Sequence, residues 1–176
     1  MFSQPGIYQL SINAMSPSIN GSGGRVCQND VKTKTICVEG PPIPKFELDK
    51  LAGCAPFIPE ISELSDISKS CKIFRKWEVF FNNNPCGVQS GNYEFIDGTN
   101  SASLVPKIKF NSRGNYKIRL KLANTCDTVI FDKQLKVLGL PSANIPSIDS
   151  ICKNGSINPT VTVTACDNTI SDCSWS

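Results

Sequence analysis

The feature that most constrains this chain is an internal repeat with a period of about 100 residues. Residues Gly6–Ile12 (GIYQLSI) and Gly114–Leu120 (GNYKIRL) share a glycine, a tyrosine and two aliphatic residues in step. Each segment is followed by a cysteine and then by a Val-x-Gly-x-Pro run, which starts at Val38 in one case and at Val137 in the other. The two valines are 99 positions apart, which is too long for a solenoid repeat and suits independently folded domains.

A third copy begins near the C-terminal end of the chain. Asp149 and Trp175 follow Asp49 and Trp77 at spacings of 100 and 98 residues. Half a unit would expose sheet edges and an apolar face, so we expect the partial units to be completed by sequence outside this chain or by a partner. The repeat predicts the C-terminal part of one unit at residues 1–41, a complete unit at 42–140 and the N-terminal part of the next at 141–176.

Within the complete unit, apolar and polar residues alternate with the period of two expected for half-buried β-strands. The clearest run is Tyr116–Leu122, in which four apolar residues alternate with three basic ones. Turn-forming residues separate this run from similar segments at 45–49, 57–64, 73–81, 92–96, 106–110 and 135–137. About seven short strands per unit, with no helical stripe, predict an all-β chain of tandem immunoglobulin-like β-sandwich domains.

Three aromatic residues are expected to support this sandwich as structural core. Trp77 lies on the third strand, where a large ring usually fills the space between the sheets, although sugar stacking at the surface is the functional alternative. Tyr116 begins the sixth strand directly after a turn, which is the position of a tyrosine corner whose hydroxyl pins a neighbouring loop. Tyr8 holds the same position in the first repeat.

The chain contains nine cysteines and no histidine, which limits the kinds of metal site and cross-link that it can form. No C-x-x-C pair occurs, which disfavours zinc and favours disulfides in an oxidising compartment, with buried reduced cysteine as the alternative. In an immunoglobulin-like sandwich Cys71 and Cys126 would lie in loops at one end, and Cys54 and Cys86 at the opposite end. We therefore predict the pairs Cys71–Cys126 and Cys54–Cys86, and a local Cys71–Cys86 bridge remains open.

Charge and motifs argue against several classes of function. The net charge of +3 comes from 18 basic and 15 acidic residues, and the basic run Lys72–Lys76 is interpreted as an exposed strand face, so nucleic acid is not an expected partner. Without histidine there is no Ser-His-Asp or Cys-His arrangement, and no glycine-rich phosphate loop occurs, so neither an enzyme nor a cofactor is expected. The segment Asp97–Asn100 lacks the alternating ligands of a calcium loop and is interpreted as a plain turn, so no metal site is predicted.

No apolar stretch in the chain approaches the length of a membrane span. The first ten residues also lack the basic start and apolar run of a signal peptide. The chain is therefore expected to be either intracellular or a piece of a longer exported protein, and the incomplete repeats favour the second.

The order of these features resembles a known family. The segments Gly53–Pro56 (GCAP), Trp77–Val79 (WEV), Asn92–Thr99 (NYEFIDGT) and Gly114–Tyr116 (GNY) follow one another as in the PKD-like repeats of giant surface adhesins of gliding, type IX-secreting Bacteroidetes. The resemblance covers the complete unit and both partial ones. The W-x-F-G-D-G segment common in PKD domains reads WEVFFN at 77–82, which is closer to the divergent PKD-like subgroup.

This resemblance implies a structural repeat in a secreted adhesin filament, located outside the cell at the outer membrane and used for attachment in gliding motility. It implies as partners the neighbouring repeat units, the type IX secretion and gliding machinery, and surface polysaccharide. Bacteria of this kind attach O-glycans at Asp-Ser/Thr followed by an aliphatic residue, which marks Thr128 and Ser150 as candidates. The alternative function is an accessory or carbohydrate-binding spacer module of a secreted hydrolase, which a neighbouring catalytic domain would favour.

Overall fold

A computed structural model of the chain describes residues 2–14, 30–82, 90–145, 147, 150, 153, 155–156 and 162–164. These residues form strands, turns and loops without any helix, so the prediction of an all-β chain is confirmed, and no described segment is a helix that could cross a membrane. The strands are β1 (Gly6–Ala14), β2 (Asp30–Val38), β3 (Phe46–Leu48), β4 (Ala52–Cys54), β5 (Ile61–Glu63), β6 (Phe74–Asn82), β7 (Tyr93–Ile96), β8 (Lys107–Phe110), β9 (Gly114–Ala123), β10 (Thr128–Leu138), β11 (Ser142–Asn144) and β12 (Thr162–Thr164).

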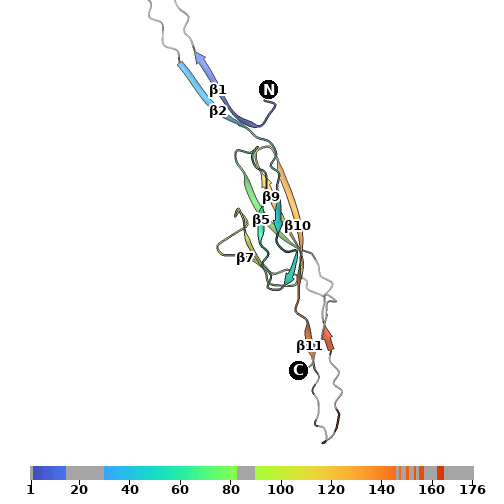
Figure 1. Cartoon of the computed structure of the whole chain (residues 1–176). Helices are drawn as coiled ribbons and strands as arrows, with labels where there is room; N and C mark the ends of the chain where they lie inside the picture. The colour runs from blue at the N-terminus through green and yellow to red at the C-terminus, as the bar shows by residue number, and fades with distance from the viewer. Residues whose placement is uncertain are drawn as a thin grey trace, which may run out of the picture.

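The strands are arranged in three parts along an elongated molecule (Figure 1). The hairpin β1–β2 projects from one end of a central body formed by β3 to β10, and the pair β11–β12 lies beyond the other end. Among the described strands, none is exchanged between the three parts. The chain therefore passes from one end of the molecule to the other.

The central body consists of two layers. One is a four-stranded sheet in the order β4-β10-β9-β6, in which β4 runs parallel to β10 and the other neighbours are antiparallel. The other contains the pairs β3–β5 and β7–β8. Reciprocal backbone hydrogen bonds of 2.9 and 2.8 Å between Phe57, just before β5, and Phe110 of β8 join these pairs. The second layer therefore has the order β3-β5-β8-β7.

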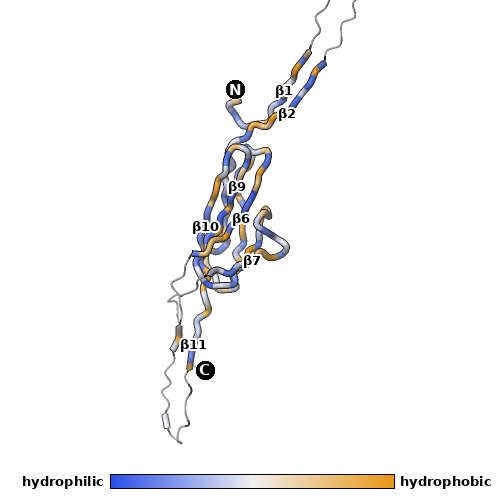
Figure 2. Tube along the Cα trace, turned by 180° about the vertical axis from the view of Figure 1, so that it is seen from behind, coloured by the Kyte–Doolittle hydropathy of each residue, from blue (hydrophilic) through white to orange (hydrophobic). Residues whose placement is uncertain are grey.

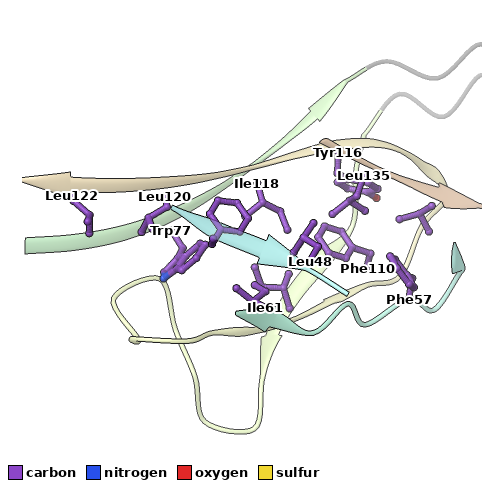
Figure 3. Packing of buried hydrophobic residues seen from close by; sticks show 13 residues of the cluster. Leu48, Phe57, Ile61, Trp77, Phe110, Tyr116, Ile118, Leu120, Leu122 and Leu135 are labelled. Carbon is purple, nitrogen blue, oxygen red and sulfur yellow. The ribbon is translucent and has the colours of Figure 1, made fainter. Parts of the chain in front are cut away.

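Aromatic and aliphatic side chains from both layers fill the space between them (Figure 3). Trp77 of β6 packs edge-to-face on Phe46 of β3 with 4.9 Å between the ring centroids, and Tyr116 of β9 packs on Phe110 of β8 at 4.7 Å. Every second residue of β9 is buried, as the sequence alternation predicts. Removal of these apolar surfaces from water is the main stabilising contribution to the body.

One strand of the body leaves no pattern in the sequence. Strand β4 has three residues and joins the sheet only through its parallel pairing with the end of β10. Gly53 is required at its centre because an added Cβ would lie 2.2 Å from the ring of Phe57. A strand held by backbone pairing and one close approach carries no periodic signal. The central unit therefore contains eight strands instead of about seven.

The hairpin β1–β2 repeats the register of the hairpin β9–β10. Gly6 is paired with Val38 in the first hairpin, and Gly114 is paired with Val137 in the second. These are the glycines and valines of the sequence repeat. The repeated residues thus occupy equivalent positions in two separate hairpins.

The tyrosine of each hairpin makes the same hydrogen bond. The hydroxyl of Tyr8 donates to the backbone carbonyl of Gln4 at 2.9 Å, and that of Tyr116 donates to the carbonyl of Ser112 at 2.8 Å. In both cases the acceptor lies four residues before the tyrosine. Each bond fastens the chain that enters the hairpin to its first strand.

The two hairpins differ in what covers them. Leu10 and Ile12 of β1 are 44% and 72% exposed, whereas their counterparts Ile118 and Leu120 in β9 are fully buried. Hydrophobic and hydrophilic residues alternate along β1 and β2 (Figure 2). Among the described residues, the first hairpin therefore presents an apolar face without a second layer against it.

Candidate functional site: the junction between the first hairpin and the central sandwich

The candidate site is the point at which the first hairpin meets the central body. Strand β2 ends at Val38, and the backbone N–H of Gly40 already donates to the carbonyl of Lys69 in the body at 2.7 Å. Only Glu39 separates the two parts. A junction of one residue leaves the backbone few dihedral angles about which the hairpin could swing.

The proline-rich segment after Gly40 belongs to the body and is not a free connection. Pro42 and Pro44 are buried, and Ile43 between them exchanges backbone hydrogen bonds of 3.0 and 2.9 Å with Asp66. Proline fixes φ near extended values and lacks an N–H, which suits an outer strand whose alternate residues point inward. The segment extends β3 toward the hairpin.

The side chain of Glu39 binds two loops of the body at once. Its carboxylate accepts hydrogen bonds from the backbone N–H groups of Cys71 at 2.7 Å and Lys72 at 3.0 Å, both in the loop before β6. It also accepts from the backbone N–H of Thr125 at 3.1 Å and from the Thr125 hydroxyl, in the turn between β9 and β10. These bonds favour the charged carboxylate, and the bond from the Thr125 hydroxyl contributes most in lowering the pKa of Glu39 from 4.5 to about 2.

The backbone of Gly40 is fastened to the same two loops. Its buried carbonyl accepts from the side-chain amide of Asn124 at 2.7 Å and from the hydroxyl of Ser70. The Asn124 carbonyl oxygen in turn accepts from the backbone N–H groups of Cys126 and Asp127 at 3.0 Å, which holds the turn in place. The junction is therefore fixed by a charged side chain and by satisfied backbone groups together.

A disulfide between Cys37 and Cys71 adds a covalent connection, and it corrects the predicted pairing. Cys71 and Cys126 do come to one end of the body, since Glu39 contacts both loops, but Cys71 bonds to Cys37 of β2 with 6.5 Å between their Cα atoms. Cys126 is a free thiol that donates to the carbonyl of Glu39 at 3.3 Å. The predicted Cys71–Cys126 bridge assumes that cysteines within the unit at 42–140 pair with one another. The junction instead places Cys37 of the preceding hairpin next to Cys71.

The second predicted pair stays a prediction. Cys54 lies in β4 as an exposed free thiol beside Leu138, at the end of the sheet opposite the junction. Its predicted partner Cys86 lies outside the described residues. Because Cys71 is occupied by Cys37, the alternative local bridge from Cys71 to Cys86 is not formed.

The junction also contains the only group of possible metal ligands among the described residues. The sulfurs of Cys37 and Cys71 and a carboxylate oxygen of Glu39 lie within 4.8 Å of one another. Cysteine binds a metal as a thiolate, and both sulfurs are joined in the disulfide. In this oxidised form the arrangement serves as a covalent clamp.

The remaining predicted residues lie away from the junction. Trp77 is 1% exposed in the core, and its indole N–H donates to the carbonyl of Ser103 at 3.0 Å. Tyr8 is half-buried and packs on Phe2 with 4.6 Å between the ring centroids. The candidate glycosylation residues Thr128, at the start of β10, and Ser150 are both exposed.

The segment interpreted as a turn does reverse the chain after β7. Asp97 and Gly98 adopt positive φ angles of 56° and 71°, and the Thr99 hydroxyl donates to the carbonyl of Ile96 at 2.7 Å. The carboxylate of Asp97 pairs with Lys107 at 2.7 Å. Its charge is thus used in an ion pair across the turn.

Sequence reasoning missed the central residue of the junction. Glu39 lies inside the repeated Val-x-Gly-x-Pro motif, but its counterpart in the second copy is Leu138, so the comparison of repeats gives no reason to single it out. The available signal was Gly40, which recurs as Gly139 at a place where the chain leaves a long hairpin.

Comparison with known proteins finds no match to the chain among family models, curated proteins or solved structures. Its function is therefore inferred from the repeat, the fold and the junction.

Proposed function

We propose that the chain is a structural link in a long extracellular filament, made of tandem immunoglobulin-like units and used for attachment at the cell surface during gliding. The observation that carries this proposal is the junction, where one residue, one disulfide and a set of hydrogen bonds fix the first hairpin to the central body. A link that transmits tension or holds a distant tip in one direction needs such a joint. A module with an independent task would tolerate a flexible linker.

The strand order supports the immunoglobulin-like assignment. The layers β3-β5-β8-β7 and β4-β10-β9-β6 correspond to the A-B-E-D and A′-G-F-C layers of such a sandwich, with the short A′ strand parallel to G. Trp77 lies on the third strand of that scheme, and Tyr116 bonds back across a corner at the start of the sixth. Immunoglobulin-like and PKD-like repeats share this architecture.

The two equivalent hairpins support a tandem array. A first hairpin with the register and the tyrosine bond of β9–β10 is what the last two strands of a preceding unit would form. Its open apolar face, with Ile12 72% exposed, would be covered by the other strands of that unit. The elongated arrangement in Figure 1 fits units joined end to end.

The disulfide supports an extracellular location. Such bonds persist in oxidising compartments and are rare in the reducing cytoplasm. Exposed Thr128 and Ser150 would be accessible to the O-glycosylation that the family resemblance implies. Attachment in gliding rests on that resemblance, to the surface adhesins of gliding Bacteroidetes.

Deletion of the parent gene tests the proposal. Cells without it are expected to lose attachment to glass and colony spreading, and complementation with the intact gene should restore both. Normal attachment and spreading, accompanied by loss of a secreted polysaccharide-degrading activity, would reject the adhesin filament and establish the hydrolase module.

A further inference from the structure

A groove of about 400 Å³ lies at the edge of the four-stranded sheet, away from the end that carries β11. Residues Phe74–Lys76 at the start of the edge strand β6, Lys121 and Ala123 at the end of β9, and the loop residues Ser101 and Ala102 line it. The volume falls in the range of roughly 300–1,000 Å³ that small-molecule sites occupy. We call it the β6-edge groove.

Two like charges face each other in this groove. Lys76 and Lys121 are direct cross-strand partners in the pairing of β6 with β9. Like charges at directly opposite positions destabilise a sheet unless something lies between them. Lys76 pairs with Glu78 at 2.9 Å, but Lys121 has no ion pair within the described part of the chain. The pair favours an anion in the groove.

A third cation in the lining is incompletely satisfied. The side chain of Arg75 is 14% exposed, and its closest ion-pair contact, to Glu63, is long at 3.7 Å. Its Nε is buried without a hydrogen-bond partner among the described residues. Arg75 alternates with Lys76 along β6 and shares the core-facing side of the strand with Trp77. Its guanidinium therefore adds positive charge behind the groove, and the two lysines are the cations that a ligand would contact.

The rim of the groove is aromatic. Phe74 is 59% exposed even though the ammonium of Lys72 lies 5.0 Å from its ring centre. An exposed aromatic ring provides a flat apolar surface for the C–H face of a sugar, and Ser101 is a polar residue of the same lining. Aromatic surface and cations thus occur in one site.

From this combination we propose that the β6-edge groove binds an acidic sugar, a uronate residue of an anionic polysaccharide. Glu63 and Glu78 oppose two of the three lining cations, which leaves a balance of one positive charge. One surplus charge suits the single carboxylate of a uronate better than a dianionic phosphate. This binding activity is separate from the linking role and does not depend on the junction.

Isothermal titration of the full chain with tetragalacturonate, at low salt and neutral pH, tests the proposal. Binding is expected for tetragalacturonate and not for the neutral oligosaccharide of the same length. The variants Lys121→Glu and Lys76→Glu are expected to weaken it by about tenfold or more, because each replaces an attraction with a repulsion. Lys136→Glu, on the outer face of the same sheet but outside the groove, serves as the charge-matched control and should bind like the natural chain.

Three results would overturn the proposal. The first is equal binding of the neutral oligosaccharide, which would make the charges irrelevant. The second is an equal loss of affinity in Lys136→Glu, which would indicate that tetragalacturonate is attracted by the overall charge of the protein and not by the groove. The third is tighter binding of single-stranded DNA of similar length, which would identify a polyphosphate surface. Lys76 is exposed and Lys121 is half-buried, so the melting temperature of each variant is measured, and an unchanged value confirms that folding is intact.

Discussion

Removal of the Cys37–Cys71 disulfide should weaken the junction and the central body by a predictable amount. The two cysteines are separated by 34 residues, and they enclose the loop from β2 to the segment before β6. For a loop of this length the chain-entropy relation gives about 12.6 cal/mol/K, or about 3.8 kcal/mol at 25 °C, of constraint on the unfolded chain. We expect the double variant Cys37→Ser/Cys71→Ser to lose about that free energy of unfolding. The double variant also prevents a lone Cys71 from pairing with Cys126.

Urea denaturation followed by far-ultraviolet circular dichroism measures this loss. With a slope of about 2 kcal/mol/M, the transition midpoint of the double variant should fall by about 2 M. Reduction of the natural chain should produce a similar shift, and reduction of the double variant a smaller one.

The single variant Cys126→Ser is the control. It removes the free thiol of the same junction and should change stability by about 0.5 kcal/mol or less. A large loss in Cys126→Ser, with little effect of Cys37→Ser, would restore the Cys71–Cys126 pairing and refute the clamp between hairpin and body. A loss below about 1 kcal/mol in the double variant would show that the bond does not constrain the unfolded chain.

Four further substitutions test three separate features. Because the pKa of Glu39 is lowered from 4.5 to about 2, its carboxylate stabilises the fold fully above pH 4.5 and loses this effect as the pH falls toward 2. The stability advantage of the natural chain over Glu39→Gln should therefore shrink across that interval in acid titrations followed by circular dichroism; a constant difference would contradict the bonded carboxylate. Tyr116→Phe should lower the free energy of unfolding by about 1–2 kcal/mol because it leaves a part-buried carbonyl unpaired, whereas Tyr8→Phe in the exposed hairpin should lower it by about 0.5 kcal/mol or less. Equal losses in urea denaturation would contradict the claim that one hydrogen bond is buried and the other exposed. Gly53→Ala should cost about 1–3 kcal/mol, seen as a lower melting temperature, because the added methyl would lie against the ring of Phe57; an unchanged melt would mean that β4 is not held there.

Strands with a local signal could be predicted from the sequence. Strand β9 alternates apolar and basic residues without interruption, and the structure buries every second residue. The repeat likewise picked out Tyr8 and Tyr116, which make equivalent hydrogen bonds in two hairpins. Periodicity and repetition are patterns along the chain, so they can be recognised in the sequence without knowledge of the fold.

The junction could not be predicted in the same way, because its contacts join distant parts of the chain. Glu39 binds the backbone of Cys71 and of Thr125, which lie 32 and 86 residues away. The choice of Cys37 as the partner of Cys71 depends on those contacts, since they bring the end of β2 to the loop. Cysteine number and spacing alone favour disulfides but leave their connectivity undetermined.

The β6-edge groove was also beyond sequence reasoning. The basic run Lys72–Lys76 predicts an exposed strand face, and Lys72 and Lys76 are exposed, whereas Arg75 is half-buried on the core-facing side of β6. What the sequence lacks is the register that sets Lys121 opposite Lys76, and the position of the Ser101 loop beside them. A groove arises from these non-local pairings.

The orientation of the first hairpin relative to the body is the most direct test of a link that keeps its direction. Residual dipolar couplings of the oxidised, weakly aligned chain report it, because each rigid body has one alignment tensor. We expect the couplings of β1–β2 and those of β3 to β10 to fit a single tensor, since Glu39, Gly40 and the disulfide fix the hairpin to the body. Two different tensors, or hairpin couplings averaged toward zero beside full values in the body, would contradict a rigid junction and with it the proposed structural link.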